Sequence, residues 1–286
     1  MNDKRQSRVA ILTDSTADLP ASLAAEHGIH VIPQILIMGD KTWRDGVDID
    51  PPAFYELLRS SSAFPSTSQP SATEFAQVFT DLAKEADGIL AVLVSDELSG
   101  TLNSARAAAA SLPEIPIEIV DSRAVSMQLG FVALAAAQAV AEGAGLAEAA
   151  DVARGMIPRA QVYFVVDTLE YLHRGGRIGA AARLVGSALN LKPILQIKDG
   201  LVTPITRVRS RRKALDTTMN LLAEVIPMDS SVHMAVLNVA APDEALHLRS
   251  QLEGCFQPVE IIETECGPVV GSHAGPGTVG VAFYVE

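Results

Sequence analysis

Aromatic residues, cysteines and histidine pairs are scarce in this chain of 286 residues. Only 5% of the residues are aromatic although 48% are hydrophobic, so aliphatic side chains must fill a large core. The two cysteines, Cys255 and Cys266, form no metal-binding pattern, and a chain of this length does not depend on a disulfide. The six histidines are scattered singly. We therefore expect two free thiols in a reducing cytoplasm, no metal site and no cofactor.

Positive charge is also in short supply. The chain has 22 lysines and arginines against 34 aspartates and glutamates, which gives a net charge of −12. Nucleic-acid binding requires a basic face, so we expect no nucleic-acid partner and no permanent adhesion to an anionic membrane. One basic cluster is most simply a solvated surface, and the alternative is a docking patch for an acidic partner or a membrane. It comprises Arg207, Arg209, Arg211, Arg212 and Lys213.

Long hydrophobic runs are missing. The apolar run near the N-terminus ends at Asp14 and is too short for a signal sequence. The most apolar long stretch, residues 129–150, is interrupted by Gln138 and Glu142 and falls short of a membrane span. These features predict a buried helix in a cytoplasmic protein.

Short apolar runs alternate with helical patterns in the first half of the chain. The runs are "RVAILTD", "IHVIPQILIM", "ILAVLV" and "IEIVDS". Strands separated by helices predict an α/β fold with a parallel sheet covered on both faces, in a Rossmann-like domain that we place at residues 1–158. Ligands of such sheets bind beyond the carboxyl ends of the strands. We expect the turns "TDST", "VSDELSG" and "VDSR" at that edge.

The pattern changes near Pro158. Residues 159–286 mix helices and strands with a hairpin expected at Asp199–Gly200, which predicts an α+β domain. We expect a helix at residues 181–190 and a glycine-rich loop before the final strand. No linker separates the two domains, and the sequence is compatible with some exchange of elements near residues 45–75.

The turn "SDELSGT" follows the strand Ile89–Val94 and precedes an alanine-rich helix. Ser99 is placed to cap a helix that begins near Gly100, where the free amides and the helix dipole would attract an anion. The turn has neither the lysine of a P-loop nor the G-x-G-x-x-G pattern of dinucleotide sites. The alternative is an ordinary helix cap with nothing bound.

Three other polar segments are candidates for a binding site. "FPSTSQPS" contains Thr67 and Ser68, "LHRGGRIG" places Arg174 and Arg177 on either side of two glycines, and "GSHAGPGTVG" contains His273. An arginine can pair with a carboxylate or a phosphate, and a histidine can donate to an anion or transfer a proton. The plainer alternatives are a polar loop, a helix end with solvated arginines, and an exposed histidine.

A serine hydrolase is a competing interpretation. Asp14, Ser99 and His273 are the residue types of a Ser-His-Asp triad. The chain has no G-x-S-x-G elbow, however, and a serine at a helix start usually accepts hydrogen bonds from backbone amides. The triad is therefore the weaker interpretation.

Taken together, these segments resemble one family. The sequences "TDSTADLP", "STSQPSATEF", "VSDELSGTLNSA", "TLEYLHRGGRI", "KPIL" and "HAGPG" occur in the order and spacing of the DegV family, over about residues 8–286. Members of this family bind a long-chain fatty acid inside the protein. Several bacterial members present its carboxylate to a separate fatty acid kinase, which makes the acyl phosphate for phospholipid synthesis. One departure is Leu102, where family members usually have tyrosine.

The resemblance implies a buried carboxylate, with the tail in a lipid tunnel between the two domains. Threonine and serine hydroxyls would hydrogen-bond the carboxylate, while an arginine and a histidine would supply positive charge or order the network around it. The contacts implied in this way are Thr67, Ser99, Arg177 and His273, with Ser68 and the amide of Gly100 as second contacts.

The implied function is that of a lipid-binding carrier without turnover of its own. Its implied partners are a long-chain fatty acid, the catalytic subunit of a fatty acid kinase, and a membrane that is contacted transiently during lipid exchange. Two alternatives stay open, namely a serine hydrolase acting on acyl esters and a lipid buffer or sensor without a kinase partner.

Overall fold

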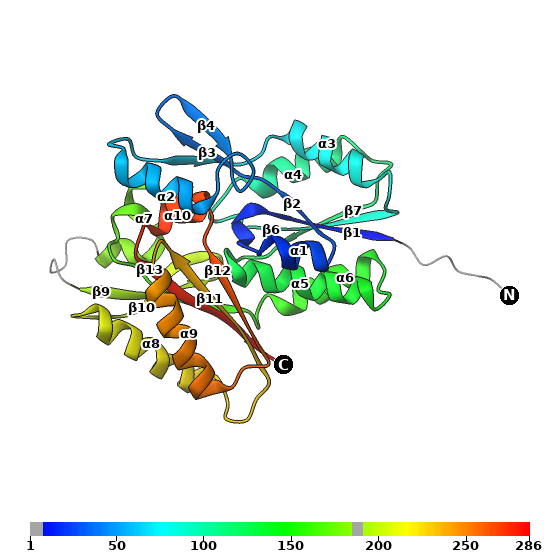
Figure 1. The fold of residues 1–286 in the computed structure, drawn as a ribbon. Helices are drawn as coiled ribbons and strands as arrows, with labels where there is room; N and C mark the ends of the chain where they lie inside the picture. Colours follow the sequence, from blue (N-terminus) through cyan, green and yellow to red (C-terminus); the bar gives the residue numbers. More distant parts are fainter. Residues whose placement is uncertain (1–7, 185–190) are drawn as a thin grey trace.

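A parallel sheet forms the N-terminal half of the structure, a computed structural model that describes residues 8–184 and 191–286 (Figure 1). The strand order is β2-β1-β6-β7, and each neighbouring pair is parallel. This confirms the expectation of a parallel sheet in the first half. The strands are β1 (Val9–Asp14), β2 (Ile29–Ile32), β6 (Gly88–Leu93) and β7 (Ile117–Asp121).

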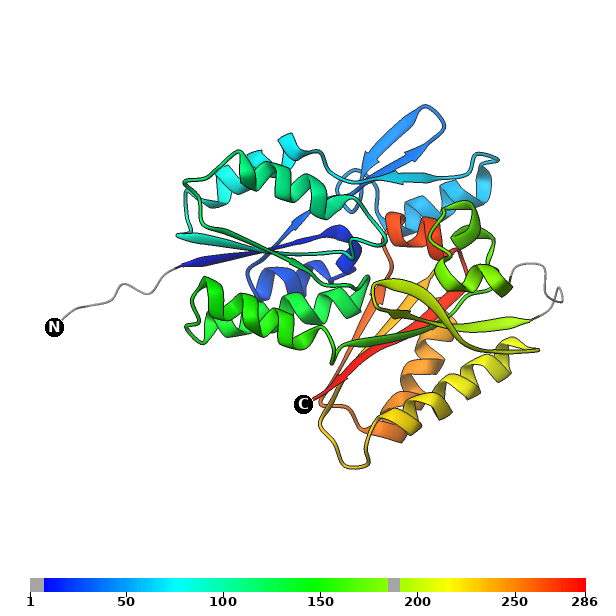
Figure 2. The ribbon, with the colours of Figure 1, turned by 180° about the vertical axis from the view of Figure 1, so that it is seen from behind.

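Helices cover both faces of this sheet (Figures 1 and 2). On one face, Phe75 and Phe79 of α3 pack with Leu102 of α4 against the strands. On the other face, α5 and α6 pack against each other and against β6. The elements are η1 (Ser15–Ala17), α1 (Ala21–Glu26), α3 (Ala72–Leu82), α4 (Thr101–Ala110), α5 (Met127–Ala141) and α6 (Leu146–Met156).

A mixed sheet forms the C-terminal half, as expected for an α+β arrangement. Its order is β10-β9-β8-β13-β11-β12, and β11 with β12 is its parallel pair. The hairpin expected at Asp199–Gly200 joins β9 to β10, and the Ser95 hydroxyl donates to the Gly200 carbonyl at 2.9 Å. The elements are β8 (Gln161–Val165), β9 (Lys192–Lys198), β10 (Leu201–Val208), α8 (Arg211–Val225), β11 (Val232–Val239), α9 (Pro242–Phe256), β12 (Glu260–Glu265) and β13 (Thr278–Val285).

The single strand expected over residues 29–38 is wrong. The chain breaks at Pro33 and Gln34, because proline has no amide hydrogen and the Gln34 amide donates to the Ser15 hydroxyl at 3.0 Å. The residues after the break leave the parallel sheet and form a small antiparallel sheet of order β4-β3-β5. Its elements are β3 (Ile35–Met38), β4 (Lys41–Arg44) and β5 (Ser66–Ser68), with α2 (Pro51–Ser60) between β4 and β5.

Two other expectations in the second half need correction. The loop expected before the final strand contains α10 (Pro268–Ala274), and its glycines Gly275 and Gly277 end that helix with φ values of 81° and 83°. The helix expected at residues 181–190 is a 3-10 helix, η2 (Gly179–Leu184), in its described part. Residues 185–190 lie outside the described residues. The short helix before the two arginines is α7 (Glu170–Arg174).

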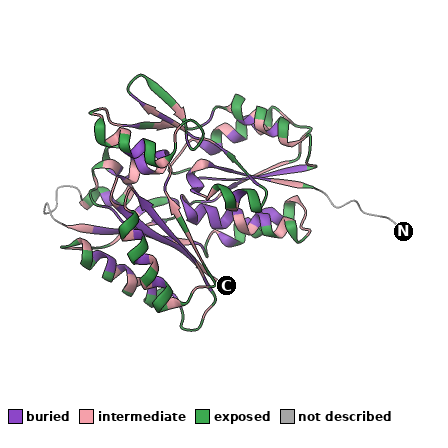
Figure 3. Ribbon diagram, in the orientation of Figure 1, coloured by how far each residue is buried: buried purple, intermediate pink, exposed green. Residues whose placement is uncertain are grey.

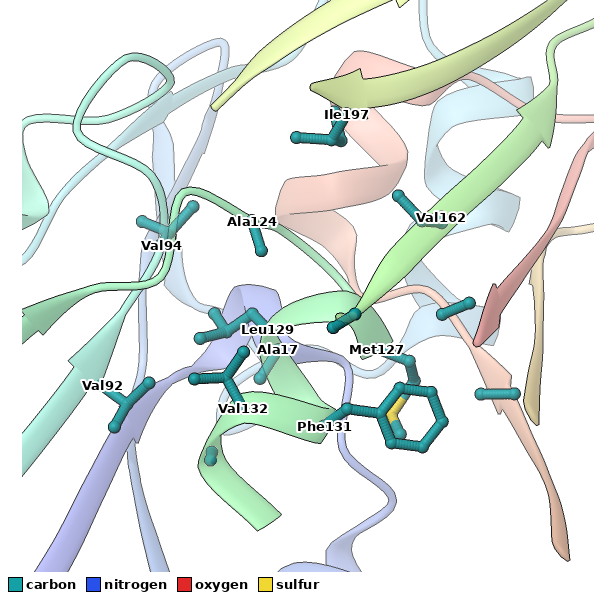
Figure 4. Close-up of a cluster of buried hydrophobic side chains, with 14 of the residues drawn as sticks. Ala17, Val92, Val94, Ala124, Met127, Leu129, Phe131, Val132, Val162 and Ile197 are labelled. Atoms are coloured by element: carbon teal, nitrogen blue, oxygen red, sulfur yellow. The ribbon is translucent and has the colours of Figure 1, made fainter. Parts of the chain in front are cut away.

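Helix α5 joins the two halves. It contacts β1 and β6 of the first sheet and β8 and β13 of the second, so it is apolar on most of its circumference. This confirms the buried helix expected within residues 129–150, and Figure 3 shows burial along α5 and the central strands. Figure 4 shows side chains from both halves meeting there, among them Val92, Val94, Met127, Leu129, Val162 and Ile197.

Within the described residues, no helix combines the length and the apolar character needed to cross a membrane. The division into domains at residues 1–158 and 159–286, and an exchange of elements near residues 45–75, stay predictions. Helix α2 from this region contacts α10 of the other half.

Candidate ligand-binding site between the two sheets

A cavity lies between the parallel sheet and the mixed sheet. Its wall is mostly aliphatic and comes from both halves of the chain, with Val94 and Val125 on one side and Val162, Ile197 and Leu237 on the other. Phe164 also lines the cavity, but most of the apolar lining residues are aliphatic, in agreement with the low aromatic content of the sequence. The cavity can therefore accept a slender apolar ligand.

Polar side chains from four separate segments meet at this cavity. Thr67 comes from β5, Ser99 from the loop before α4, Arg177 from the turn after α7 and His273 from α10. Ser68 lines the cavity as well. The structure thus brings together five of the six residues that the sequence put forward as carboxylate contacts.

The sixth, Gly100, is not one of the lining residues. It is the N-cap of α4, and a Cβ at this position would lie 3.1 Å from the Nε2 atom of Gln69, which does line the cavity. Gly100 therefore lets the Gln69 side chain pack closely against the start of the helix.

Thr67 and His273 form a hydrogen-bonded pair. The Oγ1 atom of Thr67 lies 2.8 Å from Nε2 of His273. Burial, with a smaller effect from the charge of Arg177, lowers the pKa of His273 to about 4, so the ring is neutral near pH 7. Within the described residues, His273 thus orders the network, and the positive charge at this cavity is supplied by Arg177.

The tautomer of His273 follows from its surroundings. Its buried Nδ1 atom has no hydrogen-bond partner among the described residues, and an added Cβ on Gly175 would overlap it. A buried ring nitrogen without an acceptor is better left without a hydrogen, which places the proton on Nε2. Nε2–H then donates to Thr67, whose own hydroxyl hydrogen is available to a ligand.

Ser99 does not cap α4 as expected. The N-cap is Gly100, without a side-chain cap hydrogen bond, because the helix begins one residue later than the capping prediction requires. The Ser99 hydroxyl oxygen instead accepts from the Thr101 amide at 3.3 Å and lies 2.8 Å from the Thr101 hydroxyl.

The two arginines beside the paired glycines have different roles. Arg177 is half-buried, and its guanidinium donates to the carbonyl oxygens of Leu98 at 3.0 Å and Gly175 at 2.8 Å. It thereby ties the end of α7 to the loop that carries Ser99. Arg174 is exposed, forms an ion pair with Glu170 and lies over the ring of Phe64, away from the cavity.

The basic cluster at residues 207–213 is not a uniform surface. Arg207, Arg209, Arg212 and Lys213 are exposed. Arg211 is half-buried and binds Glu244 and the carbonyl oxygens of Val165 and Gly277, so it joins α8 to α9 and to the sheet.

A triad is not assembled in the described part of the chain. His273 pairs with Thr67, and Ser99 pairs with Thr101. Asp14 accepts hydrogen bonds from Thr16 and from the Val94 amide, not from His273.

Sequence reasoning did not anticipate a group of buried carboxyl groups, those of Asp14, Asp18 and Asp45, and considered Asp14 only as a member of a triad. Burial raises the pKa of Asp18 to about 7 and that of Asp45 to about 6, and it also raises the pKa of Asp14. Asp18 accepts from the Ser126 hydroxyl at 2.6 Å and from the Gly267 amide at 2.8 Å. The motif "TDSTADLP" contains two of these aspartates and was the available signal. No group of His, Cys, Asp and Glu within residues 8–184 and 191–286 is arranged to hold a metal ion.

Other polar lining residues were missed as well: Thr16, Gln34, Gln69, Ser126, Cys266 and Thr278. Cys266 is buried and Cys255 is exposed, and both are free thiols. Burial raises the pKa of the Cys266 thiol well above its usual value, so this residue is a poor nucleophile.

Comparisons with known proteins agree with this architecture. The model of the DegV family, described as a family of uncharacterised proteins, matches residues 8–286. A DegV domain-containing protein of Streptomyces coelicolor is 39% identical over 96% of this chain and 97% of its own length.

Two solved structures are similar over nearly the whole chain. A fatty-acid-binding DegV family protein from Thermus thermophilus is 35% identical, with a TM-score of 0.92 over 98% of this chain and 100% of that chain. DegV of Bacillus subtilis, a fatty acid binding protein, is 31% identical, with a TM-score of 0.91 over 98% of this chain and 100% of its own. The match over residues 8–286 and these two similarities confirm the resemblance drawn from the sequence motifs, and the chain belongs to the DegV family.

Proposed function

We propose that this protein binds a long-chain fatty acid, with the tail in the cavity between the sheets and the carboxylate at Thr67, Ser99, Arg177 and His273. The observation that carries the proposal is the lining of the cavity, in which aliphatic walls meet one cluster of hydroxyl groups with an arginine. The fatty-acid binding of the relatives from Thermus thermophilus and Bacillus subtilis supports it.

The polar cluster suits a carboxylate in particular. A carboxylate accepts hydrogen bonds at both oxygens, and the site offers the hydroxyl groups of Thr67 and Ser99. Arg177 adds a positive charge close by, although two of its donors already serve backbone carbonyls. Ser68 is a second contact in this proposal. Gly100 would act indirectly, by allowing Gln69 to pack at the cavity wall.

The two parts of the ligand would contribute differently. Burial of a sixteen-carbon tail provides on the order of 11 kcal/mol before costs, at about 0.8 kcal/mol per CH₂. Ordering and association remove a large share of it. Each carboxylate hydrogen bond contributes only about 1.5–3 kcal/mol. The tail would therefore dominate affinity, and the polar cluster would fix orientation.

The proposal extends to a carrier without turnover, which presents the carboxylate to the catalytic subunit of a fatty acid kinase. Lipid exchange would involve transient contact with a membrane. The exposed basic residues Arg209, Arg212 and Lys213 are candidates for contact with an acidic partner or an anionic membrane surface. They form a local concentration of positive charge on a chain whose net charge is −12.

Mass spectrometry of the purified protein tests the binding proposal, first under native conditions and then after organic extraction. A stoichiometric fatty acid released on denaturation would support it and would give the chain length and saturation. A protein that is empty and takes up no added fatty acid would overturn it, and hydrolysis of acyl esters would then be assayed with wild type and Ser99→Ala.

The kinase role needs a separate experiment. The loaded protein is mixed with a fatty acid kinase catalytic subunit and ATP, and acyl phosphate is measured. Product that depends on this protein would support presentation. Intact fatty-acid binding without product would favour a lipid buffer or sensor.

A further inference from the structure

We infer that Gln34 and Thr101 are positioning residues, which turn the hydroxyl hydrogen of Ser99 toward the cavity and make this serine a hydrogen-bond donor to a bound anion. The inference rests on the proposed function, because it assigns a direction to one contact of the proposed carboxylate site. It is carried by a chain of hydrogen bonds from the buried Gln34 amide to the cavity wall.

The chain begins at Gln34, which is 2% exposed. Its amide nitrogen Nε2 donates to the hydroxyl oxygen of Thr101, 2.8 Å away. The amide oxygen cannot take this role, because only the NH₂ group of the side chain carries hydrogens.

Thr101 is the second member, and it is completely buried. Its hydroxyl has one hydrogen to donate. Of its two side-chain partners, Gln34 is a donor, so the Ser99 oxygen at 2.8 Å is the acceptor for that hydrogen. The backbone amide of Thr101 donates to the same oxygen at 3.3 Å.

Ser99 thus accepts two hydrogen bonds from Thr101. Two acceptor positions are all that a hydroxyl oxygen has, so its own hydrogen is left for a partner outside this network. Ser99 lines the cavity, where that partner would be the ligand. The pair His273–Thr67 produces the same result at β5, so that two hydroxyl donors converge on one anion.

A thermodynamic cycle tests this chain. Dissociation constants for hexadecanoic acid and for hexadecan-1-ol are measured with wild type, Thr101→Val, Thr101→Ser, Ser99→Ala and the double variant Ser99→Ala/Thr101→Val. Thr218→Val is the matched control, because Thr218 is also buried but lies on α8, where its hydroxyl donates to the Ala214 carbonyl. Far-UV circular dichroism and melting temperatures report whether each variant folds.

We expect Thr101→Val to bind the acid about tenfold more weakly, since the Ser99 hydroxyl loses its fixed direction toward a charged acceptor. The change for the alcohol is smaller, Thr101→Ser stays within about twofold of wild type, and Thr218→Val has no effect. In the Ser99→Ala background, Thr101→Val causes no further loss, because the residue acts through Ser99.

The outcomes separate the two proposals. Failure of wild type to bind the acid would overturn the proposed function itself. Tight binding by wild type with an unchanged Thr101→Val, or an equal loss in the Ser99→Ala background, would overturn the positioning role alone. If Thr101→Val does not fold, Gln34→Leu replaces it in the same cycle. Gln34→Leu removes the donor to Thr101, so it must weaken acid binding when Ser99 is present and have no effect in the Ser99→Ala background. A loss of binding that is the same with and without Ser99 contradicts the inference.

Discussion

The hydroxyl of Tyr55 donates a hydrogen bond to the backbone carbonyl of Cys266, 211 residues further along the chain. Tyr55 lies on α2 and is 1% exposed, and its ring packs directly on Gly271 of α10. This contact holds α10, and with it His273, against the N-terminal half of the chain.

Gly271→Ala should therefore destabilise the protein. The added Cβ would overlap the hydroxyl of Tyr55, and overpacking of this kind costs about 1–3 kcal/mol in the free energy of unfolding. Denaturant unfolding measures the loss, and Tyr55→Phe in the same chain should recover part of it. Gly254→Ala on α9 is the control, because its added Cβ meets nothing within 4 Å. This substitution should raise the free energy of unfolding by about 0.5–1 kcal/mol, since alanine is favoured over glycine within a helix. Equal free energies of unfolding for Gly271→Ala and Gly254→Ala would show that the close packing of Tyr55 on Gly271 does not affect stability.

Thr67→Val and Ser99→Ala should each weaken fatty-acid binding by roughly 10–100-fold, because each removes one hydrogen bond to a charged group. Their ligand-free free energies of unfolding should fall by no more than about 1–3 kcal/mol, because each variant leaves one donor, on His273 or on Thr101, without its acceptor while the apolar core is untouched. Titration with a fatty acid and thermal unfolding of the ligand-free proteins provide the two readouts. Thr80→Val, on the exposed side of α3, is the control. A large loss of ligand-free stability would instead make these hydroxyl groups structural.

His273 should make the ligand-free protein less stable in acid. Its pKa is about 4 in the folded protein against 6.5 for a free histidine, so between these values the unfolded chain binds more protons. Stability should therefore fall as the pH decreases from about 7 to 4, on the order of 3 kcal/mol more in wild type than in His273→Gln. The measurement is the difference in unfolding free energy between the two proteins across this range. A constant difference would mean that His273 titrates normally.

Asp18 should act in the opposite direction. Its pKa is about 7 in the folded protein against 3.8 for a free aspartate, so here the folded state binds more protons. The contribution of the neutral carboxyl group is complete below about pH 4 and is lost as the pH rises toward 7. Asp18→Asn should remove this dependence, and asparagine tolerates the left-handed backbone of this residue, with φ of 50°. Parallel stability curves for the two proteins would contradict the buried, protonated state.

Much of the fold could be predicted from local patterns. Alternating apolar runs and helices indicated the parallel sheet, and the absence of charge within Met127–Ala141 indicated a helix buried between layers. The break at Pro33–Gln34 was not anticipated, because the apolar run continues on both sides of it, although Pro33 was a signal present in the sequence. The second cause, a hydrogen bond from the Gln34 amide to Ser15, depends on the tertiary fold.

The site was predicted less completely than the fold. The motifs pointed to Thr67, Ser99, Arg177 and His273, which line the cavity and whose role as carboxylate contacts stays a prediction, but their geometry depends on partners far away in the sequence. Thr67 needs His273 at a separation of 206 residues, and Gln34 needs Thr101 at a separation of 67. The glycines around His273 suggested a loop, whereas α10 extends to Ala274 and the glycines only end it.

The position of β13 has a consequence for biosynthesis. This strand follows the others in the chain, yet it lies between β8 and β11 in the sheet, and its residues Thr278 and Gly280 line the cavity. A ribosome delivers β8 to β12 before the strand that joins them. The mixed sheet is therefore completed only with β13, and a nascent chain without this strand lacks part of the cavity wall against which an apolar ligand could be retained.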